Sequence, residues 1–389
     1  MSNPTALSVL DLLPRSSGDD NATAVRNAIN LAQRAEQFGY GRYWFAEHHL
    51  NPGVVGSSPA IEIALAAAAT STIRLGSAGV QFGHRTPLAT VEEFGLIDAL
   101  YPGRLDLGIG RSISRPAPAP DGAEGQDSRT AYIALRGSAT HDEDTYTDGG
   151  LLIPKAVDLT KAFDAGRVNE LVSLLQQPGA YAPDYEEQIA QVLALLNGSF
   201  THPSGRAAHA VPGEGAEIQV WILGASGGQS ATVAGENGLR FVASYHHSPS
   251  TVLDAVAGYV DSFKPSAELA EPYVAVSVDA VVAETDERAH ELASGYAPWV
   301  RSIRQGQGAM AYPTPDEAAA LEWDEAAREL VSDRVRTQFV GSPTTVADQL
   351  EQLRDATGAQ EVAITTITHD HADRVRSYEL LAQEWDRRT

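Results

Sequence analysis

Short apolar runs typical of β-strands alternate with helix-like segments along most of this chain, and this alternation constrains the fold more than any other feature. The eight runs contain Leu7, Tyr43, Ile73, Leu105, Val220, Phe241, Val274 and Val362. Strands that alternate with helices form parallel sheets through right-handed crossovers. Eight such units favour an α/β protein built as a (β/α)8 TIM barrel. A doubly wound open sheet is the second choice.

Two stretches depart from the alternation. Residues 112–212 contain a Pro-rich run at 116–120, Gly/Asp-rich residues and two expected helices, at 159–177 and 184–196. We interpret this stretch as an insertion in one barrel loop, so that residues 1–389 form a single domain. Residues 304–335 are rich in Gly, Pro and Ala with a little helix, and we predict a mobile lid there.

Composition excludes several kinds of partner and chemistry. The net charge of −23, from 28 basic and 51 acidic residues, repels nucleic acid and anionic membranes. The chain has no cysteine, which rules out disulfides and thiolate chemistry. Residues 1–14 lack the pattern of a signal peptide, and no apolar run reaches the roughly 20 residues of a membrane span. A cytoplasmic protein is therefore predicted.

The second strand ends in three ionisable residues. The aromatic run 43–46 leads directly into Glu47, His48 and His49. Pockets in parallel α/β folds lie at the carboxyl ends of the strands, so these side chains are expected at a pocket. A Glu–His pair that merely caps the strand explains the stretch equally well. A metal site shared with residues 369–371 is a weaker alternative, because Asp370 and His371 stand where a helix begins.

A small-residue loop, 224–228, joins the strand at 218–223 to the helix at 229–237. Free backbone N–H groups at a helix N-terminus bind phosphate, and the Ser226 and Ser230 hydroxyls would add donors. The same Gly-Ala-Ser-Gly-Gly sequence fits the nucleophile elbow of a serine hydrolase, with Ser226 as nucleophile and His369 or His371 as base. No oxyanion loop is visible upstream, so we prefer the phosphate interpretation.

Two further strand ends carry candidate site residues. In Gly108-Ile109-Gly110-Arg111 the glycines allow a flat ring to approach the backbone, and Arg111 can bind a phosphate bidentately. Position 113 is isoleucine, so a dinucleotide fingerprint is incomplete. His246 and His247 follow the strand at 239–244, and they either line the pocket or are solvated loop residues.

Taken together, these segments resemble the bacterial luciferase-like flavin monooxygenases. The resemblance rests on residues 43–49, 73–80, 100–111, 221–226, 339–343, 369–371 and 374–381. It is poorest over residues 112–212. It implies a luciferase-like (β/α)8 barrel that binds reduced FMN at the carboxyl ends of its strands.

The resemblance also implies roles for individual residues. His48 matches the family's active-site histidine, and Glu47 is expected to orient it. Ala78-Gly79 matches the segment beneath the flavin ring, where the family has a cis peptide. Phe45, Phe82 and Trp221 are expected to wall an apolar pocket. The remaining expected cofactor-binding residues are Gly110, Arg111, Gly224, Ala225, Ser226, Gly227, Ser230 and Ser244.

The implied activity is that of a two-component FMN-dependent monooxygenase. A separate flavin reductase would supply reduced FMN as a diffusible cosubstrate, with dioxygen as the second cosubstrate. The product would be a hydroxylated or epoxidised small molecule, with polyketide-type compounds of antibiotic biosynthesis as the expected substrates, and a homodimer is expected. The alternatives are a deazaflavin-dependent dehydrogenase on the same barrel, a serine hydrolase centred on Ser226, and a non-catalytic flavin-binding barrel.

Overall fold

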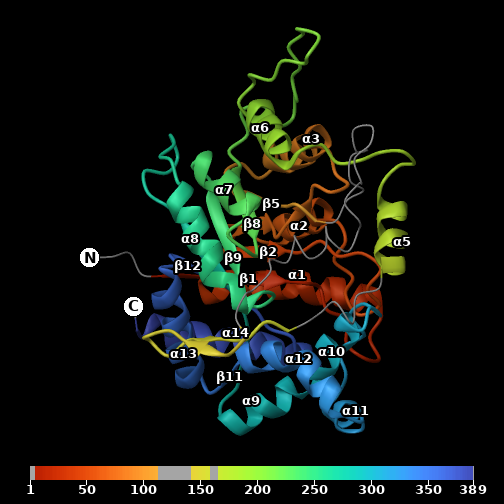
Figure 1. Ribbon diagram of the computed structural model, residues 1–389, viewed down its shortest axis with the longest axis vertical. Helices are drawn as coiled ribbons and strands as arrows, with labels where there is room; N and C mark the ends of the chain where they lie inside the picture. Colours follow the sequence, from red (N-terminus) through yellow and green to blue (C-terminus); the bar gives the residue numbers. More distant parts are fainter. Residues whose placement is uncertain (1–4, 113–141, 158–164, 389) are drawn as a thin grey trace.

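The computed structural model describes residues 5–112, 142–157 and 165–388, and its centre is a closed barrel of eight parallel strands (Figure 1). Each strand pairs with the next along the chain, and the last pairs with the first, with Leu7 opposite Val362. The predicted (β/α)8 barrel is therefore confirmed. The strands are β1 (Ala6–Asp11), β2 (Arg42–Phe45), β3 (Arg74–Ser77), β5 (Leu105–Gly110), β8 (Gln219–Gly224), β9 (Arg240–Ser244), β10 (Val274–Val282) and β12 (Glu361–Thr365).

Helices cover the outside of the barrel, and capping residues set several of their ends. Asp20 accepts a hydrogen bond from the backbone N–H of Thr23 at the first helix, which ends at Gly39 with φ +87°. No helix in the described ranges is long and apolar enough to cross a membrane. The covering helices are α1 (Asn21–Phe38), α2 (Pro59–Ala69), α3 (Pro87–Asp98), α7 (Gln229–Glu236), α8 (Val252–Ser262), α9 (Asp286–Leu292), α13 (Pro343–Thr357) and α14 (His371–Asp386).

Alternation along β2 separates side chains that face the helices from those that face the barrel interior. The Tyr43 hydroxyl donates a hydrogen bond to the carbonyl oxygen of Ala28 on α1 (3.2 Å). Trp44 points inward, where its ring meets that of Trp221 edge-on at a centroid distance of 5.2 Å. This period of two places Trp44 in the interior and its neighbours Tyr43 and Phe45 in the outer core.

A charged network, which we call the floor, closes the interior at the amino ends of the strands. Arg42 bonds through Nε to Asp106 Oδ2 (3.0 Å) and through Nη1 to Glu361 Oε2 (2.5 Å). Arg74 Nη2 lies 2.8 Å from Asp106 Oδ1, and the Arg42 guanidinium lies 4.9 Å from the Trp221 ring centroid. Buried carboxylates need such partners, because an unpaired one costs several kcal/mol.

The insertion predicted at 112–212 is described in part. It contains the antiparallel hairpin of β6 (Thr145–Tyr146) and β7 (Leu152–Ile153), which the sequence does not predict. The helix expected at 184–196 is confirmed as α6 (Tyr185–Leu196). The helix expected at 159–177 is described only as α5 (Ala165–Leu175); residues 158–164 and the Pro-rich run at 116–120 lie outside the described residues.

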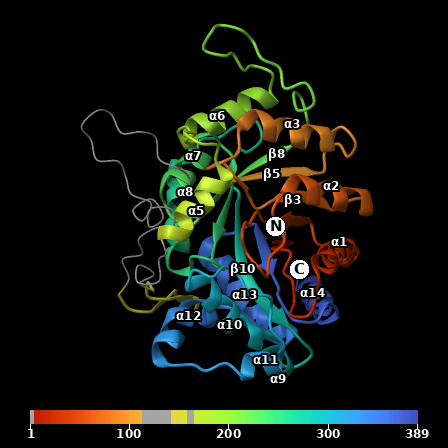
Figure 2. The same cartoon turned by 90° about the vertical axis from the view of Figure 1, so that its right-hand side faces the viewer.

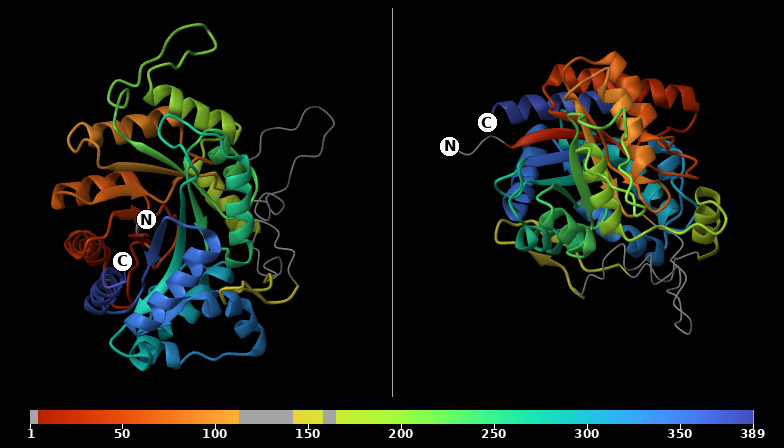
Figure 3. Two further views of the ribbon diagram at one scale, coloured as in Figure 1. Left: turned by 90° about the vertical axis from the view of Figure 1, so that its left-hand side faces the viewer. Right: turned by 90° about the horizontal axis from the view of Figure 1, so that it is seen from above.

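Helix α5 of the insertion lies at the mouth of the barrel. In Figure 1 the two chain ends lie on one side of the molecule and α5 lies on the other. Figure 2 faces the side with α5, and the left view of Figure 3 faces the side with the chain ends. Leu171 of α5 lines the pocket described below.

Several local predictions need correction. The helix expected at 284–303 is divided into α9 and α10 (Tyr296–Arg304) by the 3-10 turn η3 (Ala293–Gly295). Residues 304–335 are more helical than expected, with α11 (Pro315–Ala319) and most of α12 (Glu325–Thr337), and Tyr312 and Val331 are buried. A lid role for this segment stays a prediction. The remaining short elements are β4 (Val80–Gln81), β11 (Phe339–Gly341) and η2 (Pro249–Thr251).

Candidate active site

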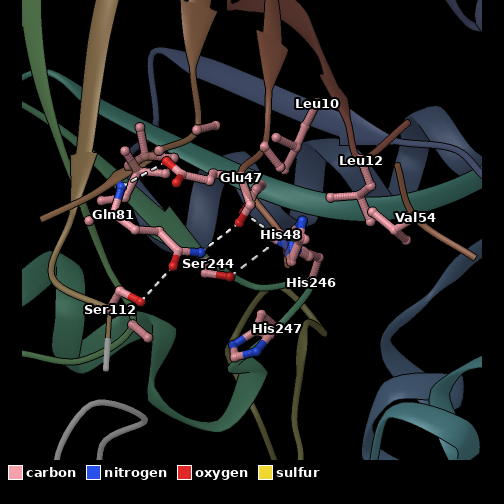
Figure 4. A pocket seen from close by; sticks show the side chains of 18 of the residues that line it. Leu10, Leu12, Glu47, His48, Val54, Gln81, Ser112, Ser244, His246 and His247 are labelled. Carbon is pink, nitrogen blue, oxygen red and sulfur yellow. Dashed lines mark hydrogen bonds between the residues drawn. The ribbon is translucent and has the colours of Figure 1, made fainter. Parts of the chain in front are cut away.

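A cavity of about 520 Å³ opens at the carboxyl ends of the barrel strands (Figure 4). The predicted residues that line it are Glu47, His48, Ala78, Gly79, Gly110, Arg111, Gly224, Ala225, Ser226, Ser230 and Ser244. Gly227 is not among the lining residues. It lies against α8, where an added Cβ would come within 2.7 Å of the Asp254 carbonyl oxygen. The fold thus brings together side chains from strands far apart in the sequence.

His48 follows β2 and forms part of the pocket wall. Its backbone N–H donates to the carbonyl oxygen of Gly56 (2.8 Å), and its Nδ1 is buried without a hydrogen-bond partner among the described residues. Burial lowers the pKa of His48 to about 4, and the neighbouring His49 acts in the same direction. A neutral imidazole on the wall of a pocket can accept a proton and return it.

The carboxylate of Glu47 bonds to other groups than His48. Its Oε1 lies 3.0 Å from His49 Nε2, 3.0 Å from His84 Nε2 and 3.1 Å from Arg85 Nε. Burial opposes ionisation, but the hydrogen bonds from His49 and His84 and the charge of Arg85 hold the pKa of Glu47 well below its usual range. The prediction that Glu47 orients His48 is therefore wrong, and Glu47 instead anchors the loop that carries His84 and Arg85.

The same cluster has the composition of a metal site. Glu47, His49 and His84 offer ligand atoms within 4.8 Å of one another in the described part of the chain. The Arg85 guanidinium, however, bonds to the carboxylate oxygen that both imidazoles face. A fixed cation at this distance opposes a second cation. The arrangement is therefore better explained as an ion-paired anchor.

Ser226 lacks the partner that a hydrolase nucleophile requires. No histidine of the described residues forms a hydrogen bond with its hydroxyl, and the two expected bases bond elsewhere. His369 Nε2 lies 3.0 Å from the carbonyl oxygen of Ser17, and His371 Nε2 lies 3.0 Å from Asn30 Oδ1. Neither histidine belongs to the group of close ligand atoms at Glu47 in the described part of the chain, so the weaker alternative of a metal site shared with residues 369–371 is not supported.

Glycines make one wall of the pocket from backbone alone. The Ala78–Gly79 peptide is cis, as the resemblance implies. A Cβ added at Gly108 would lie 2.0 Å from the Ser77 carbonyl oxygen. A Cβ added at Gly79 would lie 2.9 Å from the Gly108 carbonyl oxygen. Only glycine allows β3 and β5 to approach so closely. Where Gly79 and Gly110 line the cavity, this wall has no side chain, which suits a planar ring.

Arg111 and the N-terminus of α7 form a second wall, which we call the anion cradle. Arg111 Nη1 donates to Gln229 Oε1 (3.3 Å), while its Nε is buried without a partner among the described residues. Helix α7 begins after Gly228, has no acidic residue in its first turn, and presents Ser226 and Ser230 beside the pocket. Free N–H groups at a helix N-terminus and an unsatisfied guanidinium nitrogen suit a phosphate group.

The apolar walls differ from the predicted ones. Phe45, Phe82 and Trp221 are buried, but none of them lines the cavity. Phe45 faces outward because of the period of two along β2. The apolar side chains that do line the cavity include Leu10, Leu12, Trp44, Val54, Trp299, Val300 and Ile303.

Two polar wall residues lie beyond His48. His246 follows β9, and its Nδ1 lies 2.7 Å from Ser277 Oγ; burial lowers its pKa to about 4. Arg334 extends from α12, and its Nη2 lies 3.1 Å from Asp279 Oδ2. From the sequence the role of His246 is open, and Arg334 is not predicted at the site. The one signal for Arg334 is Asp279, the single carboxylate of a wholly buried strand, because a buried carboxylate needs a cation or hydrogen-bond donors.

Known proteins resemble this chain over most of its length. A family model described as luciferase-like monooxygenase matches residues 7–134 and 176–361. An Escherichia coli K12 protein named luciferase-like monooxygenase is 31% identical over 376 residues, which cover 96% of this chain and 95% of that protein. The crystal structure of apo-MsnO8 is similar with a TM-score of 0.74 and 28% identity, covering 98% of both chains.

A more distant structure shares the fold. It is the oxygenating constituent of the Pseudomonas putida 3,6-diketocamphane monooxygenase, a type II Baeyer–Villiger enzyme, in complex with FMN. Its TM-score is 0.61 at 19% identity, with 98% of this chain and 97% of that chain covered. The family match spans most of the barrel, and the relatives cover almost the whole chain. The protein is therefore an oxidoreductase that belongs to the luciferase-like monooxygenase family.

Proposed function

We propose that the protein is an FMN-dependent monooxygenase that uses reduced FMN and dioxygen to oxidise a small organic molecule. One observation carries the proposal: a single cavity joins the anion cradle at Arg111, the wall of small residues at Ala78–Gly79 and the half-buried His48. A flavin mononucleotide has a phosphate at one end and a planar ring at the other. The cavity offers a matching surface for each.

The residues present fit this cofactor. The unpartnered Nε of Arg111, with Ser226, Ser230 and the N-terminus of α7, would hold the phosphate. The backbone at Ala78–Gly79 would support the ring. When bound, reduced FMN supplies the electrons that activate dioxygen. The FMN in the more distant diketocamphane monooxygenase supports this choice at the level of the shared fold.

The chain's own residues would contribute water exclusion and proton transfer. Trp44, Trp299 and Val54 present apolar surface to the cavity, and a dry pocket protects a reactive oxygen species from unproductive decay. His48 would exchange a proton with the reacting oxygen, because its imidazole is neutral at physiological pH and one ring nitrogen lacks a protein partner.

The finer parts of the proposal follow from the resemblance. A separate flavin reductase supplies the reduced FMN, and the product is a hydroxylated or epoxidised small molecule, with polyketide-type compounds of antibiotic biosynthesis as the first substrates to test. A homodimer is proposed because exposed apolar side chains project from two adjacent helices: Ile61 of α2 is 62% exposed and Leu96 of α3 is 61% exposed.

The first experiment measures cofactor choice. Anaerobic titration of the protein with reduced FMN, reduced riboflavin and a reduced deazaflavin should give the tightest binding for reduced FMN. Binding of the deazaflavin alone would instead support the dehydrogenase alternative. A fluorophosphonate probe should leave Ser226 unlabelled, and covalent labelling of Ser226 would revive the hydrolase alternative.

The second experiment measures oxygen transfer. With a flavin reductase and ¹⁸O₂, a turned-over substrate should gain one ¹⁸O atom. His48→Asn should slow this reaction about a hundredfold, which is the lower end of the rate loss expected when a general acid–base group is removed. Binding of reduced FMN should be retained. His202→Asn, a change of an exposed histidine, is the matched control. Unchanged turnover in His48→Asn would remove His48 from the mechanism.

A further inference from the structure

Helix α6 of the insertion is anchored beside the anion cradle, and the proposed function gives it no task. The Tyr185 hydroxyl donates a hydrogen bond to the carbonyl oxygen of Ile109 (3.3 Å), two residues before Arg111. Gln188 Nε2 donates to the carbonyl oxygen of Phe82 (3.0 Å), which directly follows β4. Tyr185 and Gln188 are both buried, and α6 lies next to α7 in Figures 1 and 2. The first turn of α6 is thus fixed relative to β5.

A chain of two hydrogen bonds leads from the N-cap of α6 to the arginine of the anion cradle. Asp184 Oδ2 accepts from Gln229 Nε2 (3.2 Å), and Gln229 Oε1 accepts from Arg111 Nη1 (3.3 Å). An ionised carboxylate only accepts hydrogen bonds and a guanidinium only donates them, so these two partners determine which end of the amide faces each of them. The Gln229 oxygen therefore faces Arg111 because the Gln229 nitrogen is bound to Asp184.

The bond to Gln229 determines which edge of the Arg111 guanidinium is left for a ligand. Nη1 is occupied, whereas Nε is buried without a partner and Nη2 forms no hydrogen bond within the described residues. Nε and Nη2 lie on one side of the planar guanidinium, and this edge can donate two parallel hydrogen bonds to two phosphate oxygens. Because Arg111 lines the cavity, its bidentate edge is the part of the anion cradle that remains free.

Asp184 and Gln229 act from outside the cavity. Both side chains are exposed, and neither residue is among those that line the cavity. A carboxylate near the anion cradle does not attract a phosphate, since like charges repel. Direct attraction of the cofactor therefore does not explain the pair, whereas orientation of Arg111 does. An arginine that is already oriented loses less side-chain freedom when its ligand binds.

We propose that Asp184 is a positioning residue for cofactor binding: through Gln229 it holds Arg111 so that the Nε–Nη2 edge is free for the phosphate of FMN. This inference rests on the proposed function, because it assigns the anion cradle to that phosphate. It also gives the insertion a task at the cofactor, because Asp184 is the N-cap of a helix that the insertion supplies.

Two substitutions at Asp184 separate this role from helix capping. Asp184 Oδ1 accepts from the backbone N–H of Glu186 (2.8 Å) and so caps α6. Asp184→Ser keeps a good N-cap, but its single, shorter side-chain oxygen does not reach Gln229. Asp184→Asn keeps the cap and an acceptor for Gln229. Both variants remove the same negative charge, so a charge effect is equal in the two.

The readout is the ratio of the affinities for reduced FMN and reduced riboflavin, measured by anaerobic titration of the full-length protein. Asp184→Ser should lower this ratio about threefold to tenfold, the effect of about one lost hydrogen bond. Asp184→Asn should leave the ratio unchanged or slightly higher, because removing a negative charge favours an anion. An unchanged ratio in Asp184→Ser, or an equal loss in both variants, would overturn the proposal.

A double-mutant cycle tests the route through Gln229. Gln229→Leu should lower the same ratio by a similar factor, because it removes the amide that joins Asp184 to Arg111. Addition of Asp184→Ser to Gln229→Leu should lower the ratio no further, since residues that act through one another are not additive. Independent losses that multiply in the double variant would show that Asp184 does not act through Gln229, and the proposal would be wrong.

Binding of reduced FMN to the wild type separates the two levels of inference. If Asp184 is wrongly assigned, reduced FMN still binds more tightly than reduced riboflavin, and that preference still depends on Arg111. If the proposed function is wrong, the wild-type protein does not bind reduced FMN, and the role of Asp184 fails with it.

Discussion

The Nε2 atom of His84 lies 3.0 Å from Oε1 of Glu47, so the loop after β4 is tied to the end of β2 by a wholly buried carboxylate. Arg85, from the same loop, adds an ion pair at 3.1 Å. The pocket wall that contains His48 is thus braced by a neighbouring residue that does not bond to His48. Glu47 has a clear structural task, which can be separated from catalysis.

Glu47→Gln should destabilise the protein by about 3 kcal/mol, because Arg85 loses its buried counter-ion and an amide replaces one acceptor. Urea unfolding measures the change. The control is Glu93→Gln, which removes a 43% exposed partner of Arg85 and should cost less than about 1 kcal/mol. Equal losses in the two variants would show that Glu47 is not the anchor.

Arg111→Met should weaken binding of reduced FMN about 10- to 100-fold, because one or two charge-assisted hydrogen bonds to the phosphate are lost. Binding of riboflavin, which has no phosphate, should be unchanged. The difference between the two ligands isolates the phosphate. Arg206→Met, at an exposed arginine, is the matched control. A parallel loss for both flavins would place Arg111 away from the phosphate.

The lowered pKa of His48, about 4 against an ordinary value of 6.5, gives a signed prediction for stability. Between these values the unfolded chain takes up a proton that the folded protein does not. His48 therefore stabilises the fold above pH 6.5, and this contribution is lost as pH falls towards 4. His48→Gln removes it, so stability should depend less steeply on pH in the variant.

Chemical unfolding of both proteins at several pH values between 4 and 7 measures the effect of His48. Only the difference between the two curves is diagnostic, because burial raises the pKa of Glu62 to about 7 and gives that residue the opposite pH dependence. Parallel curves for wild type and His48→Gln would show that the His48 pKa is not lowered.

Replacement of Ile61 and Leu96 together by aspartate should convert a dimer into a monomer in sedimentation experiments. Both side chains are exposed on neighbouring helices, and burying two new carboxylates in an interface costs several kcal/mol. Leu174→Asp, at a 71% exposed leucine on α5, should leave the dimer intact. A monomeric wild type, or a variant that remains dimeric, would exclude this surface.

The fold was readable from the sequence because each barrel strand is specified locally. The apolar run of β2, the capping residue Asp20 and the small-residue loop before α7 each determine local structure from a few consecutive residues. The backbone parts of the site, at Ala78–Gly79 and Gly224, are local for the same reason.

Distant partners explain both the misassigned role of Glu47 and the residues that were missed. Glu47 receives hydrogen bonds from His84, 37 positions away, and Arg334 meets Asp279, 55 positions away. Trp299 reaches the pocket because α10 lies at the barrel mouth, which no spacing within α10 specifies. Local patterns predicted where the pocket is, but not which side chains complete its walls.

Closure of the barrel by its first and last strands has a consequence for how the protein is made. One edge of β1 pairs only with β12, and Trp385 Nε1 donates to the Thr5 carbonyl oxygen (2.9 Å). A nascent chain therefore carries β1 with an open edge until β12 has been synthesised, more than 300 residues later, and contacts between such distant segments form slowly. Glu361, which neutralises Arg42 in the floor, arrives on that same last strand. The final strand thus seals the barrel and balances its interior charge in one event.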